Sequence, residues 1–220
     1  MFTRKAYPQQ WAMTQHNLAS AYSIRLRGER ADNLEKAIKL YNLALEVRTR
    51  EAYPEQWAMT QNNLANAYAD RIHGDRAGNL EEAIKRYNLA LEVRTREAYP
   101  EHWAMTQNNL AEAYSTRIRG ERAENLEKAI EHYNLALQVS TRKSYPARWA
   151  TTQNNLATAY RDRIRGDRAE NLEKAMEHCN LALDVCTREA YPERWAMTEN
   201  NLAEAYSTRI RGERAENLEK

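Results

Sequence analysis

Apolar residues recur along the chain with the spacing of amphipathic helices. In the stretch 53–98, the residues Trp57, Leu64, Ala65, Tyr68 and Ile72 fall close to the helical period. They predict a first helix of about 18 residues, which we call helix A. No stretch of alternating β-branched residues occurs anywhere in the sequence. The pattern therefore predicts an all-α protein.

A second amphipathic helix, helix B, is expected in the same stretch. Pro54 suits the first turn of helix A, and Gly74 can adopt the left-handed conformation that commonly closes a helix. Asn79 is a favourable N-cap for helix B. This helix is expected to end near Ala98, and its buried side would hold Leu80, Ala83, Ile84, Tyr87, Ala90 and Leu91.

The helix pair repeats with a fixed period of 46 residues, which is marked by the Tyr-Pro pairs that begin at Tyr7, Tyr53, Tyr99, Tyr145 and Tyr191. A period of this length is typical of a solenoid, in which each unit contacts mainly its neighbours. The sequence thus predicts a single repeat array over residues 1–220, with nine helices and the stub of a tenth. Its units are 7–52, 53–98, 99–144, 145–190 and an incomplete 191–220.

Composition and charge argue against several classes of function. The 33 basic and 31 acidic residues nearly cancel, so we expect no nucleic-acid partner. No apolar run of about 18 residues occurs, so we expect no membrane partner. The first repeat starts almost directly after Met1, which leaves no room for a signal peptide and favours a cytoplasmic location.

Candidate chemistry is sparse. Cys179 and Cys186 are seven residues apart on one expected helix, so their Cα atoms would lie about 10.5 Å apart, too far for a disulfide. His132 and His178 are a whole repeat apart, which argues against a shared metal ion. No nucleophile–base constellation stands out. We therefore expect no enzyme activity, no cofactor and no metal.

The repeated residues resemble those of the tetratricopeptide repeat family. The matching positions are Leu64 and Ala65 with Tyr68 on helix A, then Ala83, Tyr87, Ala90 and Leu91 on helix B. The Asn-Asn-Leu-Ala element is similar to repeats of the kinesin light chain type, and the long period is similar to that of cyanobacterial arrays. The unit departs from the family's usual 34 residues. The resemblance implies a right-handed superhelix of antiparallel helix pairs with a concave, peptide-binding groove.

Paired asparagines recur on the helix A face that would line such a groove. An amide side chain offers two donors and an acceptor, so it can bind a peptide backbone of any sequence. The alternative is that one asparagine of each pair satisfies neighbouring helices. The Asn66 position varies between repeats, which would suit either a specificity surface or neutral drift. The candidate groove residues are Asn17, Asn62, Asn63, Asn66, Asn108, Asn109, Glu112, Asn154, Asn155, Asn200 and Asn201.

These features favour a non-catalytic scaffold that binds a protein or peptide segment in its groove. The alternative is a structural spacer or a self-assembling module. The Tyr and Trp of each Tyr-Pro-x-x-Trp element are expected to pack at the junction between repeats. The array ends are expected to expose apolar residues and so to allow a homo-oligomer; these are Leu202, Tyr206 and Ile210 at one end and Trp11, Leu18 and Tyr22 at the other.

Overall fold

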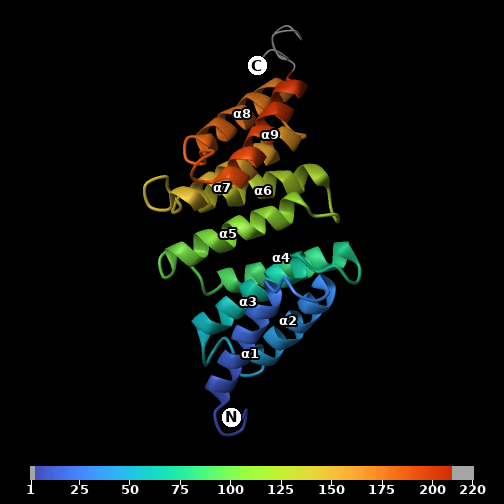
Figure 1. The fold of residues 1–220 in the computed structure, drawn as a ribbon, viewed down its shortest axis with the longest axis vertical. Coiled ribbons are helices and arrows are strands. Elements are labelled where there is room, and N and C mark those ends of the chain that lie inside the picture. The colour runs from blue at the N-terminus through green and yellow to red at the C-terminus, as the bar shows by residue number, and fades with distance from the viewer. Residues whose placement is uncertain (1–2, 210–220) are drawn as a thin grey trace. The chain divides into compact units, whose positions relative to one another are not determined.

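The structure of the protein is a computed structural model that describes residues 3–209. Within these residues, nine α-helices are joined by short loops and no strand occurs (Figure 1). This confirms the all-α prediction; the expected stub of a tenth helix lies outside the described residues. The helices are α1 (Pro8–Ser23), α2 (Arg30–Leu45), α3 (Pro54–Ala69), α4 (Arg76–Leu91), α5 (Pro100–Ser115), α6 (Arg122–Leu137), α7 (Pro146–Asp162), α8 (Arg168–Leu183) and α9 (Pro192–Thr208).

Helix A of each repeat begins where the sequence predicts and ends earlier. In α3, Tyr53 is the N-cap and Pro54 occupies the first turn, but the helix ends at Ala69. The prediction that it continues through Ile72 is wrong, and the Ile72 side chain is 60% exposed. Gly74 has a φ of 80° and lies in the loop after the helix. Because glycine has no Cβ, the chain reverses there at little steric cost.

Helix B begins three residues before the predicted N-cap. In α4 the cap is Asp75, whose carboxylate accepts hydrogen bonds from the N–H groups of Ala77 and Gly78. Asn79 is buried inside the first turns, and its Nδ2 donates to the His73 carbonyl oxygen over 2.9 Å. The side chain thus closes the loop between the two helices. The same bond is made by Asn33, Asn125 and Asn171.

Helix B also ends before the predicted boundary near Ala98. The last residue of α4 is Leu91. The chain then folds into a turn in which the Ala98 N–H donates to Thr95 Oγ1 over 3.2 Å, and the Tyr99 N–H donates to the Thr95 carbonyl over 2.9 Å. A hydroxyl that bonds nearby backbone groups competes with the helix in this way.

Within the described residues, the chain forms two compact units, which divide after Ile118. In the first unit, α1 to α4 each pack on the next helix, and α3 also contacts α1 and α5. In the second unit, α6 to α8 each pack on the next helix, and α7 also contacts α9. Each unit is therefore a stack of antiparallel helix pairs. A single uninterrupted array and its right-handed superhelix stay predictions.

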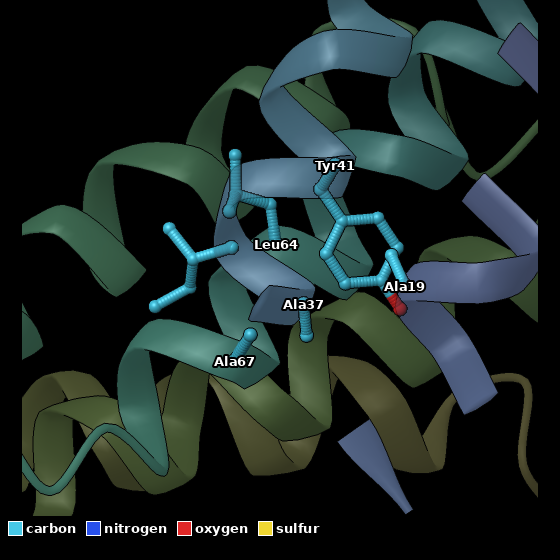
Figure 2. Close-up of a cluster of buried hydrophobic side chains, with 6 residues drawn as sticks. Ala19, Ala37, Tyr41, Leu64 and Ala67 are labelled. Atoms are coloured by element: carbon cyan, nitrogen blue, oxygen red, sulfur yellow. The ribbon is translucent and has the colours of Figure 1, made fainter. Parts of the chain in front are cut away.

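The core lies between one helix pair and the first helix of the next pair. Figure 2 shows Ala19 of α1, Ala37 and Tyr41 of α2, and Leu64 and Ala67 of α3 in one buried cluster. All five are at most 2% exposed. The alanines let the helix backbones approach closely, and Leu64 fills the space that remains. Since Leu64 comes from the following repeat, a helix pair completes its core only with its neighbour.

Ion pairs at a constant spacing join consecutive repeats. The Arg71 guanidinium donates to both carboxylate oxygens of Glu35, over 2.6 and 2.9 Å. No motif in the sequence predicted this contact. It recurs 46 residues later in the first unit and twice in the second, as Arg117–Glu81, Arg163–Glu127 and Arg209–Glu173.

An aromatic junction is present in the second unit, but it combines residues of two successive Tyr-Pro-x-x-Trp elements rather than the Tyr and Trp of one. Trp149 of α7 and Tyr191 at the start of α9 pack against Ala182 and Cys186. The Arg142 guanidinium lies 5.8 Å from the centre of the Trp149 ring, within the range of a cation–π contact. No described helix combines the length and apolarity that a bilayer span requires.

Candidate functional site

A cavity of about 320 Å³ lies between α3, α4 and α5 of the first unit. We call it the groove cavity. Three of the groove residues predicted from the sequence line it together: Asn66, Asn109 and Glu112. The other lining residues are Ala69, Asp70, Arg76, Leu80, Tyr87, Ala113 and Thr116.

In two of the repeats the first asparagine of the pair is buried and does not face the groove. Asn62 and Asn154 are each 4% exposed. The Asn62 amide donates to Asn63 Oδ1 over 3.2 Å, and the Thr106 hydroxyl of the next helix A lies 3.1 Å from Asn62 Oδ1. Placing Asn62 on an exposed face was therefore wrong. The next repeat covers this side of the helix. This agrees with the alternative that one asparagine of each pair bonds a neighbouring helix.

The second asparagine of a pair links adjacent helices A. Asn109 Nδ2 donates to Asn66 Oδ1 over 3.2 Å, and Asn201 Nδ2 donates to Asn154 Oδ1 over 2.9 Å. In the first repeat a histidine replaces the acceptor, and Asn63 Nδ2 is 3.4 Å from His16 Nε2. These amides form a ladder between repeats.

The second asparagines are nevertheless only half-buried, so part of each amide still reaches the solvent. This holds for Asn63, Asn109, Asn155 and Asn201, and Asn108 is half-buried too. Asn17, Asn66, Glu112 and Asn200 are exposed.

The floor of the groove cavity is a hydrogen-bonded tyrosine. The Tyr87 hydroxyl donates to Asn66 Oδ1 over 2.6 Å, and burial, together with the charges of Glu112 and Asp70, raises the Tyr87 pKa. Tyr87 is thus a neutral donor at physiological pH. Since Asn66 Oδ1 accepts from both Tyr87 and Asn109, the Asn66 NH₂ group remains for a ligand.

Two carboxylates border the same cavity. Asp70 pairs with Arg30 of α2 over 3.1 Å. Glu112 has no ion pair with any residue that the structure describes. Although Glu112 reaches solvent, the walls of the cavity remove part of its hydration. This desolvation, followed by the charge of Asp70, raises the Glu112 pKa.

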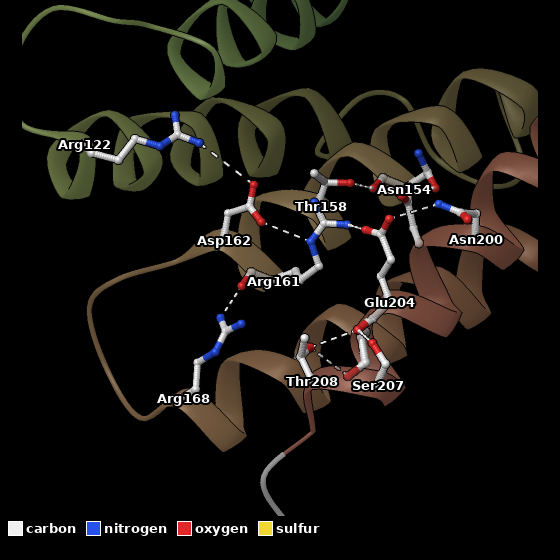
Figure 3. Close-up of polar contacts among 12 residues, drawn as sticks. Arg122, Asn154, Thr158, Arg161, Asp162, Arg168, Asn200, Glu204, Ser207 and Thr208 are labelled. Atoms are coloured by element: carbon white, nitrogen blue, oxygen red, sulfur yellow. Dashed lines mark hydrogen bonds and ion pairs between the residues drawn. The ribbon is translucent and has the colours of Figure 1, made fainter. Parts of the chain in front are cut away.

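The corresponding position of the second unit is occupied by a side-chain ion pair. Figure 3 shows Arg161 of α7 paired with Glu204 of α9 and with Asp162, over 3.0 Å for the latter. Asn200 Nδ2 also donates to Glu204, over 3.2 Å. The equivalent of Arg161 in the first unit is Ala69, which leaves Glu112 without this partner. Substitutions at these two positions thus change the charge of the groove from one repeat to another.

A buried polar cluster in the first unit was not identified from the sequence. His16 Nδ1 lies 3.1 Å from the Thr60 hydroxyl, which also accepts from Arg48 Nη1 over 3.1 Å. Burial, and then the Arg48 charge, lowers the His16 pKa to about 4, so the imidazole is neutral at pH 7. The only sequence signal was the replacement of the repeated asparagine by His16.

The expected apolar ends differ from those in the structure. Leu202 and Tyr206 pack against Ala175 and Met176 of the preceding helix α8 and are half-buried, so the expectation that they are exposed is wrong for these two residues. Ile210 lies outside the described residues. At the other end, Leu18 is 44% exposed, while Trp11 and Tyr22 are half-buried.

These features define an all-helical repeat protein in which antiparallel pairs stack and share their cores. Two segments, residues 103–137 and 149–189, match the family model described as tetratricopeptide repeat. Together with the 46-residue period and the nine helices of residues 3–209, this match supports a tetratricopeptide-repeat-like array.

A solved structure shares this fold. The chain is similar to the nearly identical TPR-like repeats of a kinesin light chain candidate from Podosopora anserina, with 21% identity, a TM-score of 0.66, and coverage of 97% of this chain and 92% of that one. It also matches BtubC (BKLC) from P. vanneervenii, with 16% identity, a TM-score of 0.49, and coverage of 96% and 85%. No curated protein sequence matches the chain.

Proposed function

We propose that the chain is a non-catalytic scaffold that holds a peptide segment of another protein along its helix A face. Repeats of this family generally mediate protein–protein interaction. The observation that carries the proposal for this chain is the groove cavity, where Asn66, Asn109 and Glu112 border a space of about 320 Å³. These residues lie next to a core that repeats almost unchanged.

The chemistry of the cavity suits an extended backbone. The Asn66 NH₂ group and the solvent-accessible part of the Asn109 amide supply donors and an acceptor side by side, because a hydrogen bond of 3.2 Å joins the two amides. Asp70 and Glu112 add negative charge at the rim. Peptides with a lysine or arginine should therefore be preferred by the first unit.

A peptide library displayed on phage tests the proposal. Peptides enriched on the wild-type protein are synthesised, and their dissociation constants are measured for wild type and for the double variant Asn66→Ala, Asn109→Ala. We expect the double variant to bind at least tenfold more weakly, since two hydrogen bonds to the ligand are lost. The matched control is Asn88→Ala, which removes an exposed asparagine amide from α4 that bonds only its own helix backbone. Equal affinity of all three proteins, or no enrichment, would contradict the proposal.

Self-assembly is a second candidate, and the outer face of α9 supports it. Ala150, Asn154 and Ala157 of α7 are at most 4% exposed under the next repeat. The equivalent residues of α9, Ala196, Asn200 and Ala203, are exposed. A second copy could cover them with its own repeat surface. Sedimentation velocity over a concentration series should then show association that Ala203→Glu abolishes; a constant monomer would refute this candidate.

A further inference from the structure

A second cavity of the first unit, with a volume of about 290 Å³, lies where the first turns of α1 and α3 face each other. We call it the Arg48 pocket. It shares no lining residue with the groove cavity, so a ligand here is independent of peptide binding there. The pocket is lined by Gln9, Gln10, Met13, Arg48, Tyr53 and Gln56.

Arg48 is a buried cation without a counter-charge. Its side chain follows the end of α2 and is only 6% exposed. Its Nη1 donates to the Thr60 hydroxyl over 3.1 Å, and no ion pair or other side-chain hydrogen bond of Arg48 occurs within residues 3–209. A guanidinium has five N–H donors, so most of them remain for the pocket. Burial also lowers the Arg48 pKa, as expected for a positive charge that has lost water.

The nearest titratable neighbour does not supply the missing negative charge. His16 shares the Thr60 hydroxyl with Arg48. It can only be neutral or positive, and the lowered His16 pKa keeps it neutral at pH 7. Removing a charge from water costs several kcal/mol unless it is paired. An anion that enters the pocket would thus recover part of this cost.

The equivalent arginine of the next repeat has a carboxylate whose charge acts on it. Arg94, the equivalent of Arg48, is 4% exposed and donates to the Thr106 hydroxyl over 3.3 Å. There, the charge of Glu55 acts on Arg94 against the effect of burial. The residue equivalent to Glu55 in the first repeat is Gln9, which lines the Arg48 pocket and has no charge. The first repeat thus keeps the buried cation but lacks the carboxylate.

The remaining walls suit an anion with a short apolar stem. The pocket lies at the N-termini of α1 and α3, whose partial positive charge favours anions. The first turn of α1 has no acidic residue, whereas that of α3 has Glu55, whose charge acts on Arg94. Gln9, Gln10 and Gln56 offer amide donors, while Met13 and Tyr53 offer apolar surface.

We propose that the Arg48 pocket binds an organic carboxylate, whose carboxyl group pairs with the unbonded edge of the Arg48 guanidinium and whose stem lies against Met13 and Tyr53. The ligand supplies a negative charge near Arg48, where the next repeat has the charge of Glu55 acting on Arg94. Its source is either an acidic side chain of a partner polypeptide or a free small acid, and both present the same group to the pocket.

Isothermal titration calorimetry on the full chain tests this proposal with two probes. Glutarate represents a free acid, and acetyl-Ala-Glu-Ala-amide represents an acidic side chain; acetyl-Ala-Gln-Ala-amide is the neutral counterpart of the peptide. We expect at least one carboxylate probe to bind and the neutral peptide to show no heat of binding. The probe with the higher affinity identifies the source.

Two variants place the binding at this pocket. Gln9→Glu introduces at an exposed position the carboxylate that the next repeat has as Glu55, and it should weaken binding at least tenfold, because its negative charge acts on Arg48 and repels the bound carboxylate. Arg48→Met should abolish binding. The control Lys39→Gln lowers the net charge by the same amount as Gln9→Glu, on the exposed side of α2, and should bind like wild type.

Three results would overturn the proposal: neither carboxylate probe binds the wild type, the neutral peptide binds as tightly as the acidic one, or Gln9→Glu binds like wild type. Circular dichroism checks that each variant folds. If Arg48→Met does not fold, Gln9→Glu decides the question alone, because Gln9 is on the surface and its replacement disturbs no buried contact.

Discussion

The ion pair between Glu35 and Arg71 should stabilise the contact between the first two repeats measurably. The perturbation is a double-mutant cycle of Glu35→Gln, Arg71→Met and both changes together. The cycle is needed because Arg71 Nη1 also lies 3.3 Å from Asn79 Oδ1, so Arg71→Met alone removes more than one contact. The coupling free energy isolates the ion pair from that contact.

The size of this coupling free energy follows from the geometry of the ion pair and the exposure of its side chains. Two nearly parallel N–H···O bonds of 2.6 and 2.9 Å make this a bidentate pair, the strong kind. Two unit charges about 4 Å apart near a surface attract by about 4 kcal/mol before any cost is subtracted. The side chains are 28% and 35% exposed, so water and salt screen part of this attraction. We therefore expect a coupling of about 1–2 kcal/mol.

The same pair should contribute to the pH dependence of stability. The hydrogen bond from Arg71 lowers the Glu35 pKa below its ordinary value of 4.5. The folded state therefore favours the charged carboxylate, and this stabilisation is complete above about pH 4.5. It is lost as the pH falls through the lowered pKa, and Glu35→Gln should remove that part of the acid-induced loss.

Urea unfolding followed by circular dichroism measures the four proteins of the cycle. Since repeat arrays can unfold in parts, hydrogen exchange of α2 and α3 should accompany it. A coupling below about 0.3 kcal/mol, or one that is unchanged in 1 M salt, would refute the reasoning, because a half-exposed ion pair is screened.

Two further predictions concern the core and the buried histidine. Leu64→Ala should lower the free energy of unfolding by about 2–5 kcal/mol in urea, because Leu64 is 0% exposed at the centre of a cluster from three helices; Leu18→Ala, at 44% exposure, should cost under about 1 kcal/mol. Protonation of His16 should lower the free energy of unfolding by up to about 2–3 kcal/mol as the pH falls from 6.5 to 4. The reason is that His16 binds its proton at a higher pH in the unfolded state than in the folded state. His16→Asn, the residue of the other repeats, should flatten this pH profile of thermal unfolding; an unchanged profile would show that His16 is charged in the folded state.

The period and the apolar spacing were enough to predict the repeating helix pairs. Their boundaries were harder, because several polar residues compete for each cap. Asn79 has the chemistry of an N-cap, but Asp75 takes that role and Asn79 closes the loop. Propensity alone does not distinguish a side chain that bonds the first turn from one that reaches back to a carbonyl six residues earlier.

The groove residues were only partly predictable for a related reason. Two faces of helix A are polar, one toward the solvent and one toward the next repeat. Asn62 and Asn66 are both polar and one turn apart, yet Asn62 is buried and Asn66 is exposed. The charges that act on the buried arginines were not predictable at all. They depend on which repeat has a carboxylate near its arginine, as the second repeat has Glu55 near Arg94.

The loop asparagines have a consequence for how such a chain changes length. Asn79 closes its own hairpin through the His73 carbonyl, and the bond from Arg71 to Glu35 always reaches 36 residues back. Both contacts are copied whenever a 46-residue segment is copied. Unequal crossing-over can duplicate or delete one such segment. Every remaining helical hairpin then keeps its asparagine–carbonyl hydrogen bond, and every junction between repeats keeps its arginine–glutamate ion pair. The gene can gain or lose repeats without first evolving a new contact.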